Sequence, residues 1–157
     1  MTNKRELYNS DIEIGVRVLL ILKFSKKSLT SDELNLYDFL SLHSDLVKED
    51  IDIRPNIHPS NPSFGLELYS KKNILNEAIH MLIHKGLVDV DISNDVIAYK
   101  ANQLTHLLLT YFESEYFSIL SRETLLVVNE MSKFTKNELQ EFVNEKLTTW
   151  HTFIEFD

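Results

Sequence analysis

The first long hydrophobic run of the chain predicts a central helix. Residues 11–24 follow Ser10 and carry Glu13 three residues later, which is the capping pattern of a helix start. The run is apolar on almost every side, so we expect neighbouring elements to cover it on several sides. Arg17 and Lys23 interrupt it, and it is shorter than the ~20 apolar residues that a bilayer span requires. We therefore expect a buried helix and no membrane anchor.

Two further helices follow the same logic. Thr30 and Glu33 repeat the capping pattern and predict a second helix from 31 to about 43. Apolar residues at helical spacing predict a third helix over 71–85, and Gly86 supplies the left-handed conformation in which helices often end. Between them, residues 45–70 lose this periodicity and contain all three prolines of the chain. This segment predicts a long irregular loop, which is uncommon unless it is functional or a tethered surface loop.

A β-hairpin comes directly after the third helix. Residues 88–92 alternate apolar and acidic side chains, 93–95 have turn composition, and 96–99 predict a returning strand. Three helices followed by a hairpin are ordered as in a winged helix, with 71–85 in the position of the recognition helix. The predicted fold is thus mainly α with a small β-hairpin, a winged-helix-like core over residues 1–101.

The remaining chain, 102–157, predicts a helical extension. Its pattern indicates helices over 102–112, from 114 to about 134 and from 135 to about 147, followed by an aromatic tail. We expect this extension to pack on the core or on a partner. Four aromatic residues of the extension, at helical spacing, are most simply residues of the hydrophobic core, and the alternative is a groove for a partner helix. They are Tyr111, Phe112, Tyr116 and Phe117.

Charge and composition restrict the function. The chain has 157 residues, no cysteine and a formal net charge of −8, from 24 acidic against 16 basic side chains. The negative charge opposes a dedicated nucleic-acid binder. The absence of cysteine excludes thiolate chemistry and fits a reducing compartment, so we expect a cytoplasmic protein. The third helix still offers three candidate nucleic-acid contacts, Lys71, Lys72 and Lys85.

No residue pattern predicts an enzyme. Three glycines are too few for a phosphate-binding loop or a nucleophile elbow, so we expect neither a nucleotide cofactor nor a catalytic triad. His80 and His84 share a helix face, with Glu77 one turn before, which resembles metal-binding spacing. However, Met81 occupies the place of the catalytic glutamate of zinc proteases, and the sequence offers no third ligand. We expect exposed helix histidines, no metal and no other cofactor.

Several short motifs, in order, resemble one protein family. They run from about residue 9 to 100, and none is catalytic. They are Asn9-Ser10-x-Ile12-Glu13-Ile14-Gly15-x-Arg17-Val18-Leu19, Tyr37-Asp38-Phe39-Leu40-x-x-His43-Ser44, His58-Pro59-x-x-Pro62, Gly65-x-Glu67-Leu68 and Gly86-Leu87-Val88. The chain resembles the small middle component of bacterial ABC-three-component systems, which is similar to the accessory subunit of Lamassu-type anti-phage and anti-plasmid defence complexes.

The resemblance implies a non-enzymatic connector. Its partners would be an SMC-like ABC ATPase and an effector, often a nuclease, that it restrains until foreign DNA is sensed. DNA contact would be indirect or weak, and no small-molecule substrate is expected. The candidate interface lies on three elements: the second helix end (Tyr37, Asp38, His43, Ser44), the long loop (His58, Pro59, Pro62, Glu67) and the tail (Trp150, Phe153, Phe156). For the apolar members of this set, a place in the hydrophobic core is the simpler interpretation.

Two other functions remain open from the residues alone. A free-standing winged-helix transcription regulator would retain a specific DNA fragment with a strong dependence on salt. A small metal-dependent enzyme would hold metal that is lost on His80→Ala. A connector, in contrast, binds DNA poorly alone and needs its large partner.

Overall fold

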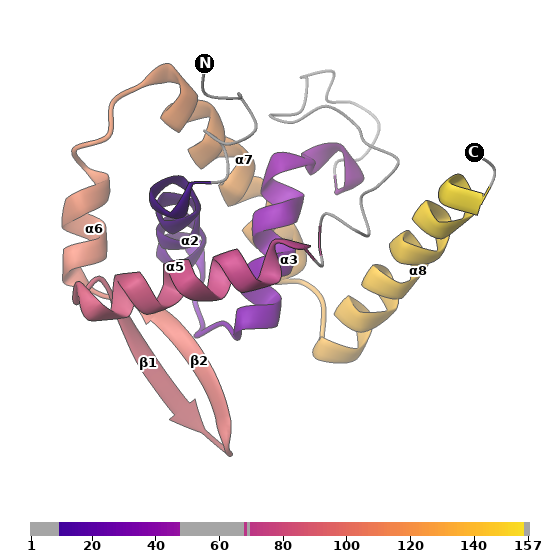
Figure 1. Cartoon of the computed structure of the whole chain (residues 1–157), viewed down its shortest axis with the longest axis horizontal. Coiled ribbons are helices and arrows are strands. Elements are labelled where there is room, and N and C mark those ends of the chain that lie inside the picture. Colours follow the sequence, from indigo (N-terminus) through magenta and orange to yellow (C-terminus); the bar gives the residue numbers. More distant parts are fainter. Residues whose placement is uncertain (1–9, 48–67, 69, 156–157) are drawn as a thin grey trace.

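The computed structural model describes residues 10–47, 68 and 70–155, with side chains up to residue 145. Its elements are mainly helices, with one two-stranded sheet (Figure 1). In chain order they are α2 (Asp11–Phe24), α3 (Ser31–Leu42), the 3₁₀ helix η1 (Ser44–Leu46), α5 (Lys72–His84), β1 (Val88–Ser93), β2 (Val96–Ala101), α6 (Gln103–Leu109), α7 (Glu115–Met131) and α8 (Lys136–Glu155). The predicted fold class, mainly α with a small hairpin, is confirmed.

Helix α2 is the centre of the described structure. The Ser10 side chain accepts a hydrogen bond from the Glu13 amide and caps its start, as predicted. Helices α3, α5, α6 and α7 and strand β2 all pack against it. As a result, nearly every side chain from Ile14 to Leu22 is buried. The sequence of α2 is apolar on almost every side because a helix covered on several sides needs no polar face.

Local signals determine the ends of the next two helices. A full capping box joins Thr30 and Glu33 at the start of α3. Helix α5 ends at Gly86, whose φ is +73°, and the Leu87 and Gly86 amides donate back to the carbonyls of Leu82 and Ile83. This is a Schellman motif, and it confirms the predicted helix end. The first two residues of the predicted 45–70 loop belong to η1. Residues 48–67 of that loop lie outside the described residues.

An isolated β-bridge joins the hairpin to the connection between α2 and α3. Strands β1 and β2 pair antiparallel, and Asn94 and Asp95 form a two-residue turn with positive φ at both positions. On the other side of β2, the amide of Leu29 donates to the Tyr99 carbonyl at 2.9 Å and the amide of Tyr99 donates back at 2.8 Å. This bridge holds the hairpin against the first two helices.

The C-terminal helices differ in how they attach. Helix α7 packs against both α2 and α3, and its Leu120, Val127 and Met131 belong to the same core as α2. Helix α8 begins at a capping box of Thr135 and Glu138, as predicted, but continues to Glu155. It diverges from the other helices in Figure 1. Its described apolar side chains, such as Phe142, are only partly buried against the core.

Candidate interaction surfaces

A buried ion pair links the two helices that carry the family motifs. Arg17 of α2 has no exposed surface, and its Nε lies 2.6 Å from Asp38 Oδ1 on α3. Its Nη2 donates to Asp38 Oδ2 at 3.2 Å, so the contact is bidentate. Burial is the largest single effect and favours the neutral guanidinium, but the charge of Asp38, its hydrogen bond and the charge of Glu13 act together against it, so the pKa of Arg17 is raised. The pair is therefore charged and internal.

The same arginine connects α7 to this pair. Glu13, one turn before Arg17 on α2, places its Oε1 3.8 Å from Arg17 Nη1. The Tyr116 hydroxyl of α7 donates to the same oxygen at 2.7 Å. Side chains from three helices thus meet around one buried cation, and each satisfies a polar group of another.

A second polar contact lies at the end of α3. The Ser44 hydroxyl donates to Oε2 of Glu123 on α7 at 2.6 Å, and both residues are buried. Arg122, which is half exposed, lies 3.4 Å from the other carboxylate oxygen. The ring of His43 is buried and packs against Phe39, with 4.8 Å between the ring centroids. These contacts join α7 to the helix end that sequence reasoning assigned to a partner.

The four predicted interface residues of the second helix therefore lie in the interior. Tyr37, Asp38, His43 and Ser44 are all at most 2% exposed. Burial, with a smaller effect of Glu33, raises the pKa of Tyr37 to about 12. Two of them join helices inside the fold: Asp38 links α3 to α2, and Ser44 links the end of α3 to α7. A partner cannot reach these side chains in the described conformation.

The outer face of α5 is polar and weakly charged. Lys71 is only 6% exposed, and Lys72 pairs with Asp32 of α3 at 2.8 Å. Lys85, at the end of the helix, is exposed. The other exposed side chains along the helix include one acid and no further Lys or Arg: Asn73, Glu77, His80 and His84. Of the three predicted nucleic-acid contacts, only Lys85 is both exposed and without an ion pair to another described residue.

His80 and His84 are both exposed on this face, as expected. Within the described residues, no group of three or more His, Asp or Glu side chains is arranged to hold a metal ion. No side chain from another described element therefore joins His80 and His84 as a third metal ligand.

Large apolar side chains are exposed at two places outside the predicted interface, and of these residues only Tyr111 belonged to the alternative groove for a partner helix. On the hairpin, Val90 is 43% and Ile92 69% exposed. On α6, Leu104 and Leu107 are half exposed, and Tyr111 directly after it is 74% exposed. Tyr111 is thus not a core residue, which corrects the simpler expectation. The three-residue spacing of Leu104 and Leu107 was a readable signal for one face of α6, whereas Tyr111 lies in the turn after the helix.

The family of the chain is shown by its sequence. A model of the ABC-three component (ABC-3C) system Middle Component 2 family matches residues 7–152. The chain belongs to this family. No curated protein and no solved structure matches it. It is therefore one component of an ABC-three-component system, and protein partners are part of that assignment.

The other predicted interface residues of this middle component lie outside the residues, or outside the side chains, that the structure describes. His58, Pro59, Pro62 and Glu67 belong to 48–67, and Phe156 follows the last described residue. Trp150 and Phe153 lie within α8, but their side chains are beyond the described part. In the described chain, no helix is both long enough and apolar enough to cross a membrane.

Proposed function

We propose that this middle component is a non-enzymatic docking subunit of a cytoplasmic, Lamassu-type defence complex against phages or plasmids. In this role it binds an SMC-like ABC ATPase and holds an effector, a nuclease, inactive until foreign DNA is sensed. Membership of the ABC-three-component family supports the assembly. The identity of the partners comes from the resemblance of the sequence.

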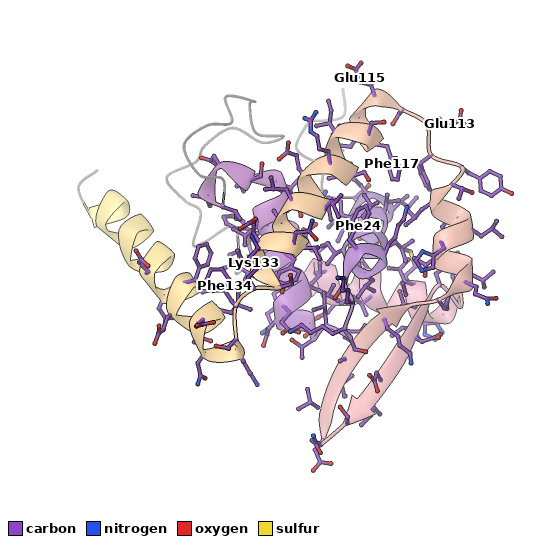
Figure 2. All side chains as sticks on the ribbon, turned by 180° about the vertical axis from the view of Figure 1, so that it is seen from behind. Phe24, Glu113, Glu115, Phe117, Lys133 and Phe134 are labelled. Atoms are coloured by element: carbon purple, nitrogen blue, oxygen red, sulfur yellow. The ribbon has the colours of Figure 1, made fainter. Side chains whose placement is uncertain are left out.

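The exposed face of α6 carries this proposal. Leu104, Leu107 and Tyr111 are large, apolar and at least half exposed. Glu113 and Glu115 follow directly, and Figure 2 shows both carboxylates at the connection between α6 and α7, projecting from the body. Clustered exposed apolar side chains with a charged rim are typical of protein interfaces. An acidic rim fits a partner that handles DNA and is basic there.

The chemistry of α5 supports docking over DNA reading. We interpret α2, α3, α5 and the hairpin, with Leu29 where a third strand would lie, as a winged helix. In DNA-reading members of this class, the recognition helix enters the groove and basic side chains hold the phosphates. Here Lys71 is buried and Lys72 is paired with Asp32. The net charge of −8 adds long-range repulsion.

The test is co-expression of the tagged chain with the products of its neighbouring genes. We expect affinity purification, gel filtration and mass spectrometry to show a large coiled-coil ATPase that stays bound at high salt. The variant Leu107→Glu should lose it, because the charge enters the apolar face. Leu125→Glu, on an exposed apolar position of α7, is the matched control and should keep it. No retained ATPase with the unaltered chain overturns the proposal.

One observation favours a different function, a free-standing transcription regulator. The bridge between Leu29 and Tyr99 lies where a winged helix would have a third strand, and many DNA-binding proteins use that fold. The same purification separates the two functions. A dimer that elutes alone with a discrete DNA fragment, released by salt, indicates a regulator.

A further inference from the structure

The outer edge of β1 has free backbone groups at two positions. In an antiparallel pair, alternate residues direct their N–H and C=O groups toward the partner strand or away from it. Both groups of Tyr99 bond to Leu29, so they face away from β1. Tyr99 is opposite Val90, and a non-hydrogen-bonded pair has this geometry on both strands. The backbone groups of Val90, and of Ile92 two residues on, therefore face outward.

No described element covers this edge. Val90 is 43% and Ile92 69% exposed, and the hairpin extends beyond the helices in Figure 1. Among the described residues, no hydrogen bond from outside the hairpin reaches the backbone of either residue. An exposed edge of this kind is a template for another strand.

The hairpin also carries more acidic than basic side chains, and its register places the one cation, Lys100, opposite Asp89. Asp89 accepts a hydrogen bond from the Asn102 amide at 3.0 Å, and Asp91 accepts one from the Ser28 hydroxyl at 2.7 Å. Neither carboxylate, nor that of Asp95 in the turn, forms an ion pair with a described residue. Lys100 is the single cation on β1, β2 and their turn.

We propose that the outer edge of β1 is a strand-addition site for an extended, basic segment of another component of the complex. The inference rests on the proposed docking function and names the chemistry of one contact. An added strand places its side chains beside those of β1 on the same face. The segment therefore alternates apolar residues, beside Val90 and Ile92, with Lys or Arg, beside Asp89 and Asp91.

A second copy of this chain does not fit the same edge. Pairing β1 with β1 brings Asp89 and Asp91 of the two copies close together, and like charges on adjacent strands are destabilising. These carboxylates thus oppose self-association at the edge and favour a basic partner.

Proline substitution tests the edge with little effect on the hairpin itself. Val90→Pro removes an N–H that faces outward, and a proline is tolerated on an edge strand for this reason. Ile97→Pro is the matched control, because Ile97 lies opposite Ile92 and its N–H faces outward from β2. The tagged chain and both variants are each co-expressed with the other components of the system. The affinity of each chain for the other components is then measured. Amide exchange is measured residue by residue in each chain, both alone and in the complex.

We expect Val90→Pro to lower the affinity of the complex about tenfold or more, because a backbone hydrogen bond to the added strand and the bonds next to it are lost. Ile97→Pro should change the affinity less than about twofold. In the free chain, the amides of Val90 and Ile92 should exchange quickly while that of Asp91 is protected. In the complex, all three should exchange slowly.

The alternatives have distinct outcomes. If a complex forms and both variants bind alike, or if Val90 and Ile92 stay unprotected, the strand-addition site is wrong and the docking function stands. If free Val90→Pro loses protection at Asp91, the hairpin is damaged, and exchange in the unaltered complex decides. If the unaltered chain forms no complex, the docking function fails and this inference fails with it.

Discussion

At the scale of single residues, the described interior contains a charged pair among its apolar side chains. Arg17 and Asp38 are both essentially inaccessible, and they hold α2 against α3 through two hydrogen bonds. Removing a charge from water is costly, so such a pair is stable only while both members are present. Arg17 and Asp38 thus have a structural role in this fold.

Breaking this pair should be far more costly than replacing it. We expect Arg17→Met to lower the free energy of unfolding by about 3–5 kcal/mol, because Asp38 is left as an uncompensated buried charge. The double variant Arg17→Met/Asp38→Leu should recover much of that loss. Lys133→Met, which removes an exposed pair with Glu130, is the control and should cost at most about 1 kcal/mol. Urea unfolding measures all three, and equal loss in the single and double variants would contradict the explanation.

Tyr37 should make the protein sensitive to alkali. Its pKa is about 12 in the fold, mainly through burial, and about 10 in an unfolded chain. Between these values the unfolded state loses the proton first, so stability falls as the pH rises. We expect the loss of stability from pH 9 to 11 to be smaller in Tyr37→Phe than in the unaltered chain. Tyr111→Phe, at an exposed position, should leave the pH profile unchanged in the same urea titrations.

At the scale of elements, short-range interactions determine where helices start and end. Capping boxes begin α3 and α8, and a Schellman motif ends α5. The two glycines described in the structure serve different purposes. Gly15 lies where α2 crosses α5, whereas Gly86 has a backbone conformation that other residues adopt only with strain.

Replacing the two glycines by alanine should have opposite effects. A Cβ at Gly15 would lie 3.3 Å from the terminal methyl of Met81, a flexible group that can move by a few tenths of an ångström. We expect Gly15→Ala to raise the free energy of unfolding by up to about 1 kcal/mol through helix propensity. Gly86→Ala should lower it by about 1 kcal/mol because of the positive φ. Thermal unfolding compares the pair, and destabilisation by Gly15→Ala would show that Met81 cannot move.

At the scale of the whole molecule, the C-terminal extension and the N-terminal core share one hydrophobic interior. Leu109 of α6 and Leu120, Val127 and Met131 of α7 are buried in the same cluster as α2. The Tyr116–Glu13 and Ser44–Glu123 hydrogen bonds cross the same boundary. Residue 101 is therefore not a boundary between independently packed units.

Shortening the chain should show this dependence. A chain ending at residue 101 loses the α7 cover of α2 and α3, so we expect it to lack cooperative thermal unfolding and sharp amide resonances. A chain ending at residue 134 keeps α7 and loses only α8, whose described apolar residues are partly buried. It should keep a single cooperative transition. Cooperative folding of the shorter chain would mean that α7 is dispensable.

The sequence by itself determined the local structure. The bounds of α2, the capping boxes, the helix end at Gly86 and the hairpin turn were all predictable, because each depends on residues three to five positions apart. The length of α8 was underestimated, since its polar residues give no clear stop signal.

Only the tertiary structure decided which side chains are inside. Arg17, Asp38 and Lys71 are polar yet buried, while Ile92 and Tyr111 are apolar yet exposed. Burial depends on which elements pack together over long separations in the chain, as when α7 covers α3. The type and spacing of residues show which side chains share a face, but not whether another element covers that face, so the exposure of α6 and β1 was decided by the packed fold.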